Sequence, residues 1–250
     1  MASEEQAHHN CCFREWLILQ EQDLLELIRG QTAYTGSPDH RVLLSQLVHK
    51  NIQHFQDYVD KRSQLAGRDS WAFFAPSWCT SLENSLLWIG GFRPSMFIRL
   101  VYSLCGPSEI ESQLDEFLRG VGTTNLGWLS GEQLTLVDRL QRKNIKEENM
   151  LSSRMASLQE NIADDPLAAV ARSLSPIGES DVDTDRALDA HAKAMASMLG
   201  EADQLRLRTL KDLMGILTPL QGVEFLAASK KLQLSMHEWG KKIDHSLGRN

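Results

Sequence analysis

Apolar residues recur at helical spacing along most of the chain and divide it into a series of amphipathic helices. The first helix runs from Phe13 to Ile28, with Gln20 as a polar exception on its apolar face. The second starts at Ser37-Pro38, where proline suits the first turn. The same spacing predicts later helices at about 77–90, 94–105, 107–120, 129–161, 186–217 and 220–240.

No segment has the alternation typical of a strand, so the sequence predicts an all-α fold. We expect a multi-helix bundle with long antiparallel helices. Residues 13–240 are assigned to a single helical domain between flexible ends at 1–12 and 241–250. Residues 173–185 mix Ser, Pro, Gly and acidic side chains, which predicts a flexible acidic loop.

The most distinctive stretch is residues 76–95. Glycine at Gly90-Gly91 ends the helix predicted before it, and Pro94 suits the first turn of the next helix. The sequence therefore predicts a helix, a glycine corner and a second helix. The predicted inward-facing apolar stripe of the first of these helices consists of Leu82, Leu86 and Ile89.

Composition narrows the class of protein. A net charge of −7 argues against broad, nonspecific binding to nucleic acid, which needs a positive surface. No apolar run approaches the length of a bilayer span, and the polar N-terminus does not resemble a secretory signal. The four cysteines are few and irregularly spaced, so we expect no disulfide framework and a location in the nucleus and/or cytoplasm.

Three blocks of sequence carry a resemblance to a known family. The first is Trp78 and Glu83 followed by residues 87–95, Leu-Trp-Ile-Gly-Gly-Phe-Arg-Pro-Ser. The second is residues 201–210, and the third is residues 227–232 continuing to 236–240. In this order they resemble the plant Delay of Germination (DOG) domain, which also forms the C-terminal half of TGA-type bZIP transcription factors. The DOG-like part begins near Phe13, so we expect no bZIP region before it.

The resemblance implies a non-enzymatic plant regulatory protein that acts through protein–protein interaction in seed dormancy and abscisic-acid signalling, and that regulates transcription indirectly. Implied partners are type-2C protein phosphatases, a second copy of the chain and TGA bZIP factors. An alternative is a pollen-aperture factor of the inaperturate-pollen type. Direct DNA contact is not expected, because the basic residues Arg206, Arg208 and Lys211 form only a small patch beside acidic side chains.

The first helix holds the candidate partner-binding residues. In dormancy regulators a motif resembling Asp-Ser-Tyr-Leu-Glu-Trp is tied to self-association and phosphatase binding, and residues 11–16 are similar to it. The resemblance therefore implies partner-binding roles for Phe13, Glu15 and Trp16. An exposed aromatic pair would suit a binding hot spot. The alternative is that Phe13 and Trp16 dock the first helix onto the bundle.

Two histidine-containing segments are candidates for binding a ligand or a metal. Gln233 and His237 lie one helical turn apart. In haem-binding members of the family the corresponding positions look like a His-x-x-x-His pair, of which Gln233 replaces the first histidine. His237 is thus a candidate haem ligand, and a haem-responsive sensor is an alternative function. A structural histidine beside a core stripe is the other interpretation. The cluster from His8 to Cys12 lacks the ligand spacing of a zinc site, so no metal is expected.

No catalytic pattern is present in the sequence. It contains no Gly-x-Ser-x-Gly elbow, no phosphate-binding loop and no dinucleotide fingerprint. Acidic pairs are plentiful, but charged helix surfaces explain them. We therefore predict a protein that is not an enzyme.

Overall fold

The structure is a computed structural model that describes residues 2–105, 129–164, 168, 171 and 182–249. Within these ranges every regular element is a helix, apart from one isolated bridge between Trp88 and Gly91. The all-α prediction is confirmed. The helix predicted at 107–120 and most of the predicted acidic loop at 173–185 lie outside the described residues.

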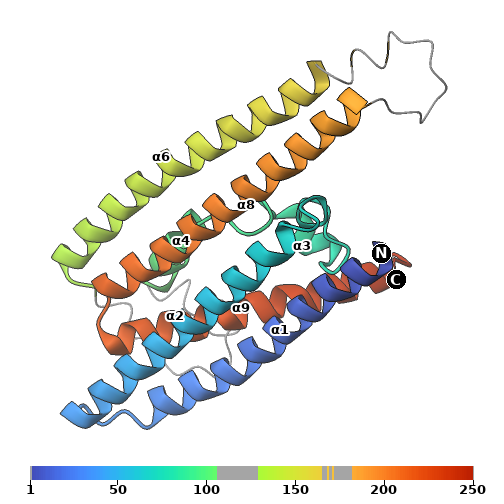
Figure 1. Cartoon of the computed structure of the whole chain (residues 1–250). Helices are drawn as coiled ribbons and strands as arrows, with labels where there is room; N and C mark the ends of the chain where they lie inside the picture. The colour runs from blue at the N-terminus through green and yellow to red at the C-terminus, as the bar shows by residue number, and fades with distance from the viewer. Residues whose placement is uncertain (1, 106–128, 165–167, 169–170, 172–181, 250) are drawn as a thin grey trace.

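Five long helices make up most of the described structure (Figure 1). The first two pack as an antiparallel pair, and so do the next two, α6 and α8. The last helix, α9, packs against the first two, and both termini lie at one end of the bundle. The bounds are α1 (Ala2–Thr32), α2 (Pro38–Ala66), α6 (Gly131–Ile162), α8 (Val182–Ile216) and α9 (Pro219–Ser246).

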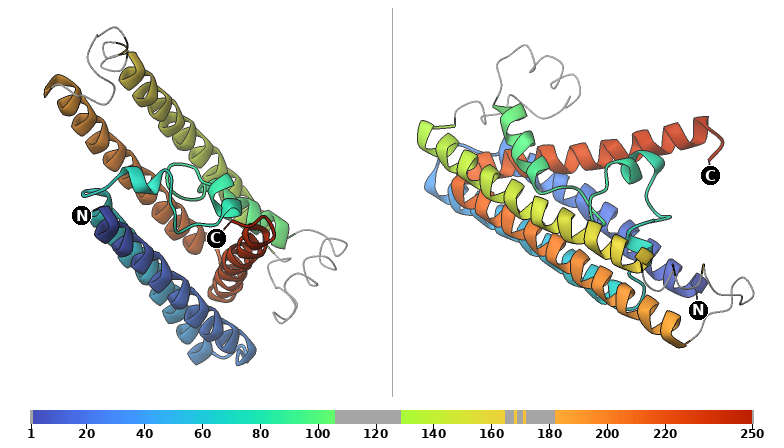
Figure 2. Two further views of the ribbon diagram at one scale, coloured as in Figure 1. Left: turned by 90° about the vertical axis from the view of Figure 1, so that its right-hand side faces the viewer. Right: turned by 90° about the horizontal axis from the view of Figure 1, so that it is seen from above.

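Three short helices lie between the two sets of long helices: η1 (Trp71–Phe73), α3 (Ser81–Ser85) and α4 (Ser95–Leu104). Figure 2 shows from two further sides that this middle segment separates the C-terminal half of α9 from the α6–α8 pair. α3 packs on α9, and α4 contacts α6, α8 and α9. The middle segment therefore joins the two halves of the bundle.

Side-chain caps start three of the long helices. The Ser37 hydroxyl accepts a hydrogen bond from the backbone N–H of His40, so the predicted start of α2 is confirmed. Ser130 begins α6 in a capping box with Gln133. Thr218 begins α9 in the same way, with Pro219 at the first helical position. A cap formed within a few residues therefore marks the start of each of these three helices.

Where the sequence predicts flexible ends at 1–12 and 241–250, the structure has helix over residues 2–12 and 241–246. α1 begins at Ala2 rather than near Phe13, since the segment is rich in Ala, Glu and Gln, which favour helix, and His9 packs against the side chain of Trp78. α9 continues to Ser246. There the Asp244 carboxylate accepts a hydrogen bond of 2.9 Å from the backbone N–H of Ser81, which ties this end to α3.

The helix predicted at 77–90 is also wrong. α3 spans only five residues, and Leu86, expected in the apolar stripe, is 40% exposed. Ile89 and Gly90 have φ values of 45° and 66°, in the left-handed region that an α-helix does not use. Residues 86–94 therefore form a loop, and α4 starts directly after Pro94, close to its predicted start.

The main hydrophobic core lies where α1, α2, α4, α6, α8 and α9 meet. A second, smaller cluster packs Ile89 of the loop against the α6–α8 pair. The loop is thus built into the core. The largest fully buried apolar side chains are Phe225, Leu27, Leu44, Ile98, Met198, Leu199, Leu205, Leu207 and Leu213.

Candidate functional site

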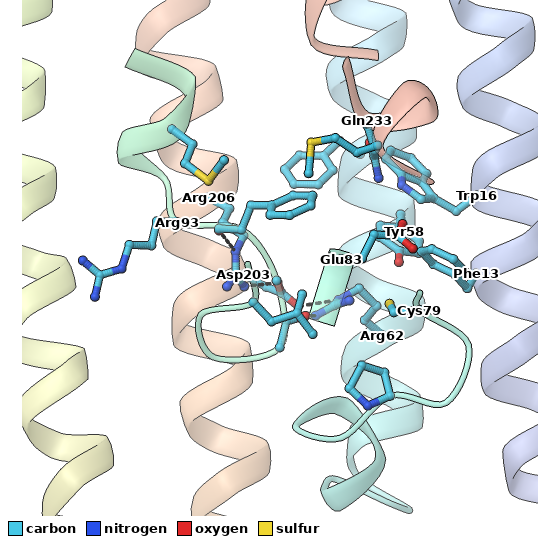
Figure 3. Close-up of a pocket in the computed structure, with 18 of the residues that line it drawn as sticks. Phe13, Trp16, Tyr58, Arg62, Cys79, Glu83, Arg93, Asp203, Arg206 and Gln233 are labelled. Carbon is cyan, nitrogen blue, oxygen red and sulfur yellow. Dashed lines mark hydrogen bonds and ion pairs between the residues drawn. The ribbon is translucent and has the colours of Figure 1, made fainter. Parts of the chain in front are cut away.

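A cavity of about 170 Å³ lies between α1, α2, α9 and the middle segment (Figure 3). Its walls bring together Phe13 and Trp16 of the first helix and Gln233 of the last. The sequence indicates these three positions for unrelated reasons. Aromatic side chains form much of the lining: Phe13, Trp16, Phe55, Tyr58, Phe73, Trp78, Phe92 and Phe97.

A buried ion network closes one side of the cavity. The Asp203 carboxylate accepts one hydrogen bond of 2.6 Å from Arg206 Nη1 and another of 2.9 Å from Arg62 Nε. All three side chains are almost fully buried. Two guanidiniums around one carboxylate leave an excess positive charge. Backbone carbonyl groups of the neighbouring loop offset this charge by accepting hydrogen bonds from both arginines.

The loop 86–94 is held by these two arginines. Arg206 donates to the carbonyl oxygens of Phe92, Ile89 and Trp88 at 2.7, 2.9 and 2.5 Å. Arg62 donates to the carbonyl of Gly90 at 2.6 Å. The close approach explains Gly91, because a Cβ there would lie 2.9 Å from the guanidinium carbon of Arg206.

Arg206 therefore does not belong to the small basic patch predicted with Arg208 and Lys211, because its side chain is buried and the residue is only 4% exposed. Arg208 and Lys211 do lie on the surface, where Arg208 pairs with Glu147 at 2.9 Å and Lys211 donates to Gln56 at 3.2 Å. The resemblance to the family in residues 201–210 thus reflects, in part, a structural role.

The three candidate partner-binding residues have different surroundings. Trp16 is buried and stacks on Tyr58 with ring centroids 4.2 Å apart, so this residue docks α1 onto α2. Phe13 is half-buried and lies edge-on to His237 at 5.8 Å. Glu15 is exposed and pairs with Lys61 of α2 at 3.2 Å.

A further exposed surface, which the sequence did not indicate, lies on the side of α1 opposite the buried Trp16. Ile18 is 50% exposed and Leu25 55% exposed, and they follow the exposed Cys11 at intervals of seven residues. A shallow hollow at the start of this face is lined by Ala7, Asn10, Cys11, Arg14, Glu15 and Ile18. We call the side of α1 that presents Cys11, Ile18 and Leu25 the outer face.

His237 is held by α3. Its Nδ1 lies 3.0 Å from Glu83 Oε2, and the same oxygen accepts from the backbone N–H and the hydroxyl of Thr80, both at 2.8 Å. Burial alone would raise the pKa of Glu83, but the hydrogen bonds from His237 and Thr80 lower it below its usual value. These contacts join α3 to α9.

The residues as placed do not fit haem. His237 does not line the cavity, and the side chain that does, Gln233, offers an amide rather than an imidazole. A cavity of about 170 Å³ is also far smaller than a porphyrin. A haem-ligand role for His237 stays a prediction, which an absorbance titration with haem tests on the wild-type chain and on His237→Ala.

A second buried polar cluster explains the polar exception in the first helix. Lys230 of α9 donates to Gln20 at 3.1 Å and to Asp23 at 3.0 Å, both on α1. His54 of α2 lies 2.9 Å from the other oxygen of Asp23. Burial lowers the pKa of Lys230, although Asp23 acts in the opposite direction. The cluster joins three helices.

Two further findings concern the described ranges only. No group of three or more His, Cys, Asp or Glu side chains there is arranged to hold a metal ion. None of the helices in those ranges combines the length and apolar character that crossing a bilayer requires.

Comparison with known proteins places the chain in a family. Residues 22–103 match the DOG1 family, described as seed dormancy control. Over 94% of its length the chain is 42% identical to Protein DOG1-like 1 of Arabidopsis thaliana, of which it covers 89%. The chain belongs to the DOG1-like family. The resemblance drawn from the three sequence blocks is confirmed.

More distant relatives of this DOG1-like chain include two proteins with other names. Protein RESPONSE TO ABA AND SALT 1 of Arabidopsis thaliana is 25% identical over 89% of the chain and 90% of that protein. Transcription factor TGA2.3 of Oryza sativa subsp. japonica is 26% identical over 86% of the chain, which spans 58% of that factor. None of these matches indicates an enzyme family.

Proposed function

We propose that this DOG1-like chain is a non-enzymatic regulator of seed dormancy and abscisic-acid signalling that acts through protein–protein contacts in the nucleus and/or cytoplasm. The family match, described as seed dormancy control, is the observation that carries this proposal. The relative named for its response to ABA supports the link to abscisic acid. Transcription would be affected indirectly, through the bound partner.

The outer face of α1 is the contact surface in this proposal. Trp16 faces the bundle, so the family motif at residues 11–16 can meet a partner only through the side chains that remain outside. Ile18 and Leu25 expose large apolar side chains on that side, and burying them against a partner would release water. The occupant to which we commit is a type-2C protein phosphatase, because the resemblance ties this helix to phosphatase binding.

The test is a binding measurement with purified full-length chain and a type-2C phosphatase of the abscisic-acid pathway. Ile18→Glu places a charge on the outer face, and we expect it to weaken binding at least tenfold. Met150→Glu is the matched control, because Met150 is 59% exposed on α6, far from α1 in sequence. Unchanged binding by Ile18→Glu would contradict the proposed surface.

Two other partners are distinguishable in the same experiment. Light scattering of the two variants reports self-association, and capture of a purified TGA factor reports that interaction. If Ile18→Glu weakens self-association or TGA binding but leaves phosphatase binding intact, the outer face serves that partner instead. Trp16→Ala is unsuitable as a probe of the surface, because Trp16 is buried and its loss would damage the core.

A further inference from the structure

We propose that the cavity between α1, α2, α9 and the middle segment binds a small, neutral ring compound that carries one hydroxyl or amide group. This binding activity goes beyond the proposed function and does not depend on any protein partner. Four properties of the cavity carry it: its size, its walls, the pairing of its charges and one polar group without a partner.

The size of the cavity limits the ligand to about one ring. Its volume is about 170 Å³. An engineered apolar cavity of about 150 Å³ in another protein stays dry and binds benzene. A ring with one small substituent is therefore the largest compound expected without movement of the walls.

The walls favour a flat, apolar body. Trp16 and Tyr58 stack on each other and present their rings to the cavity, as Figure 3 shows. Met96 and Met236 lie in the lining as well, and methionine adapts its shape and makes favourable contacts with aromatic rings. Burial of an apolar ring against such walls stabilises the complex by removing water from both surfaces.

The charged groups in the lining argue against an ionised ligand. Arg62 and Arg206 share Asp203 and hold the loop carbonyls, and Glu83 is bound by His237 and Thr80. The fifth charged group in the lining, Arg93, is half exposed and lies 3.9 Å from Glu148. A carboxylate or ammonium entering the cavity would lose its hydration without gaining an unpaired opposite charge.

Gln233 supplies the polar contact. Its side chain extends from α9 to the cavity beside Trp16 (Figure 3), and within the described ranges its amide forms no hydrogen bond with the protein. A primary amide both donates and accepts. It can therefore pair with a hydroxyl or an amide of a bound ring compound, which fixes the chemical class of the ligand.

The test uses three probes of one size: benzyl alcohol, toluene and benzoate. Each is titrated into the full-length chain, and binding is measured by ligand-observed NMR and by calorimetry. We expect benzyl alcohol and toluene to bind and benzoate to bind at least tenfold more weakly. In Gln233→Leu, benzyl alcohol should bind about fivefold more weakly while toluene changes less than twofold, since only the alcohol loses a hydrogen bond.

A filling variant locates the site. Ser229 lines the cavity from α9, and Ser229→Leu should abolish binding of both neutral probes. Ser235→Leu on the same helix lies outside the lining and should leave binding unchanged. If Ser229→Leu does not fold, NMR shifts of the Met96 and Met236 methyl groups during titration of the wild-type chain locate the probe. Absence of binding by both neutral probes, or tighter binding of benzoate, would overturn the proposal.

Discussion

The carboxylate of Asp203 lies 2.6 Å from the guanidinium of Arg206, one helical turn further along α8. Its second oxygen binds Arg62 of α2 at 2.9 Å. Other donors of both arginines hold carbonyl groups of the loop 86–94. One acidic side chain thus keeps two cations in place, and they in turn keep the loop in its left-handed turn and position the cavity wall.

Asp203→Asn should therefore destabilise the protein strongly. The substitution leaves two buried guanidiniums without a countercharge, and breaking a buried ion pair in this way costs about 3–5 kcal/mol. Urea unfolding followed by circular dichroism measures the change in the free energy of unfolding. Asp212→Asn is the control, because its pair with Lys143 is about half exposed and should contribute less than about 1 kcal/mol. Similar losses in the two variants would contradict a special role for Asp203.

Elements set by local chemistry could be predicted from the sequence. The start of α2 at Ser37-Pro38 and the corner before α9 at Pro219 depend on caps within a few residues. The loop 86–94 could not be predicted, because Leu82, Leu86 and Ile89 fit helical spacing. The loop is held by Arg62 and by Arg206, and Arg206 is 118 positions from Trp88 in the sequence.

The candidate site shows the same limit. The sequence left open whether Trp16 faces a partner or the bundle, since both uses need an aromatic residue at the same helical position. Its stacking partner Tyr58 belongs to another helix, so only the folded chain decides. The cavity itself was not predicted, because its lining comes from segments far apart in sequence. The one signal available was charge at Asp203 and Arg206 within an otherwise apolar helical stripe.

Glu83 should make the protein sensitive to acid. Burial opposes its ionisation, but the hydrogen bonds from His237 and Thr80 hold its folded-state pKa below the ordinary value of 4.5. The folded state therefore binds fewer protons than the unfolded state, so this stabilisation is present above pH 4.5 and is lost as the pH falls through the folded pKa. Urea unfolding between pH 3 and about 7 gives the free energy of unfolding as a function of pH. The fall of this free energy at the acidic end, which we call the acid limb, should be less steep for Glu83→Gln than for wild type.

The control for this pH dependence is Glu26→Gln. Glu26 pairs with Lys50 on the surface, and both side chains are more than 40% exposed. Its loss should leave the slope of stability against pH nearly unchanged. An acid limb of equal slope in wild type and Glu83→Gln would show that the Glu83–His237 contact does not carry this sensitivity.

His9 should loosen the start of α1 at mildly acidic pH. The ring is buried between Trp78, at 4.9 Å, and Phe73, at 4.8 Å, and neither ring nitrogen has a hydrogen-bond partner within the described ranges. Burial lowers the pKa of His9 below 6.5, while Asp69 and Glu5 oppose this shift more weakly. The neutral ring therefore stabilises docking above pH 6.5, and this contribution is lost as the pH falls through the folded pKa.

Amide hydrogen exchange of residues 2–12 measures this docking. We expect their protection, relative to that of the core of α8, to fall between pH 7 and about 5 in wild type. His9→Phe keeps an aromatic ring without a titratable group, so its protection should stay constant over the same range. Equal behaviour of the two proteins would rule out His9 as the source.

Gly240 should tolerate no side chain, because it lets α9 approach the cap of α3. A Cβ at this position would lie 2.0 Å from the hydroxyl oxygen and 2.6 Å from the Cβ of Thr80. Gly240→Ala must therefore displace Thr80, whose hydroxyl is bound to Glu83, and overpacking of this kind costs about 1–3 kcal/mol. The expected loss of stability should appear in urea unfolding together with a weaker acid limb.

Gly200 of α8 should tolerate a side chain, and the same urea unfolding measurement tests this expectation. No atom lies within 4 Å of a Cβ built there, so Gly200→Ala should stabilise the protein by about 0.5–1 kcal/mol through helix propensity alone. Because both substitutions add one methyl group inside a helix, the difference between them isolates the contact with Thr80. If Gly240→Ala were also stabilising, α9 would have room to move away from α3, and the Glu83–His237 contact would not depend on this close approach.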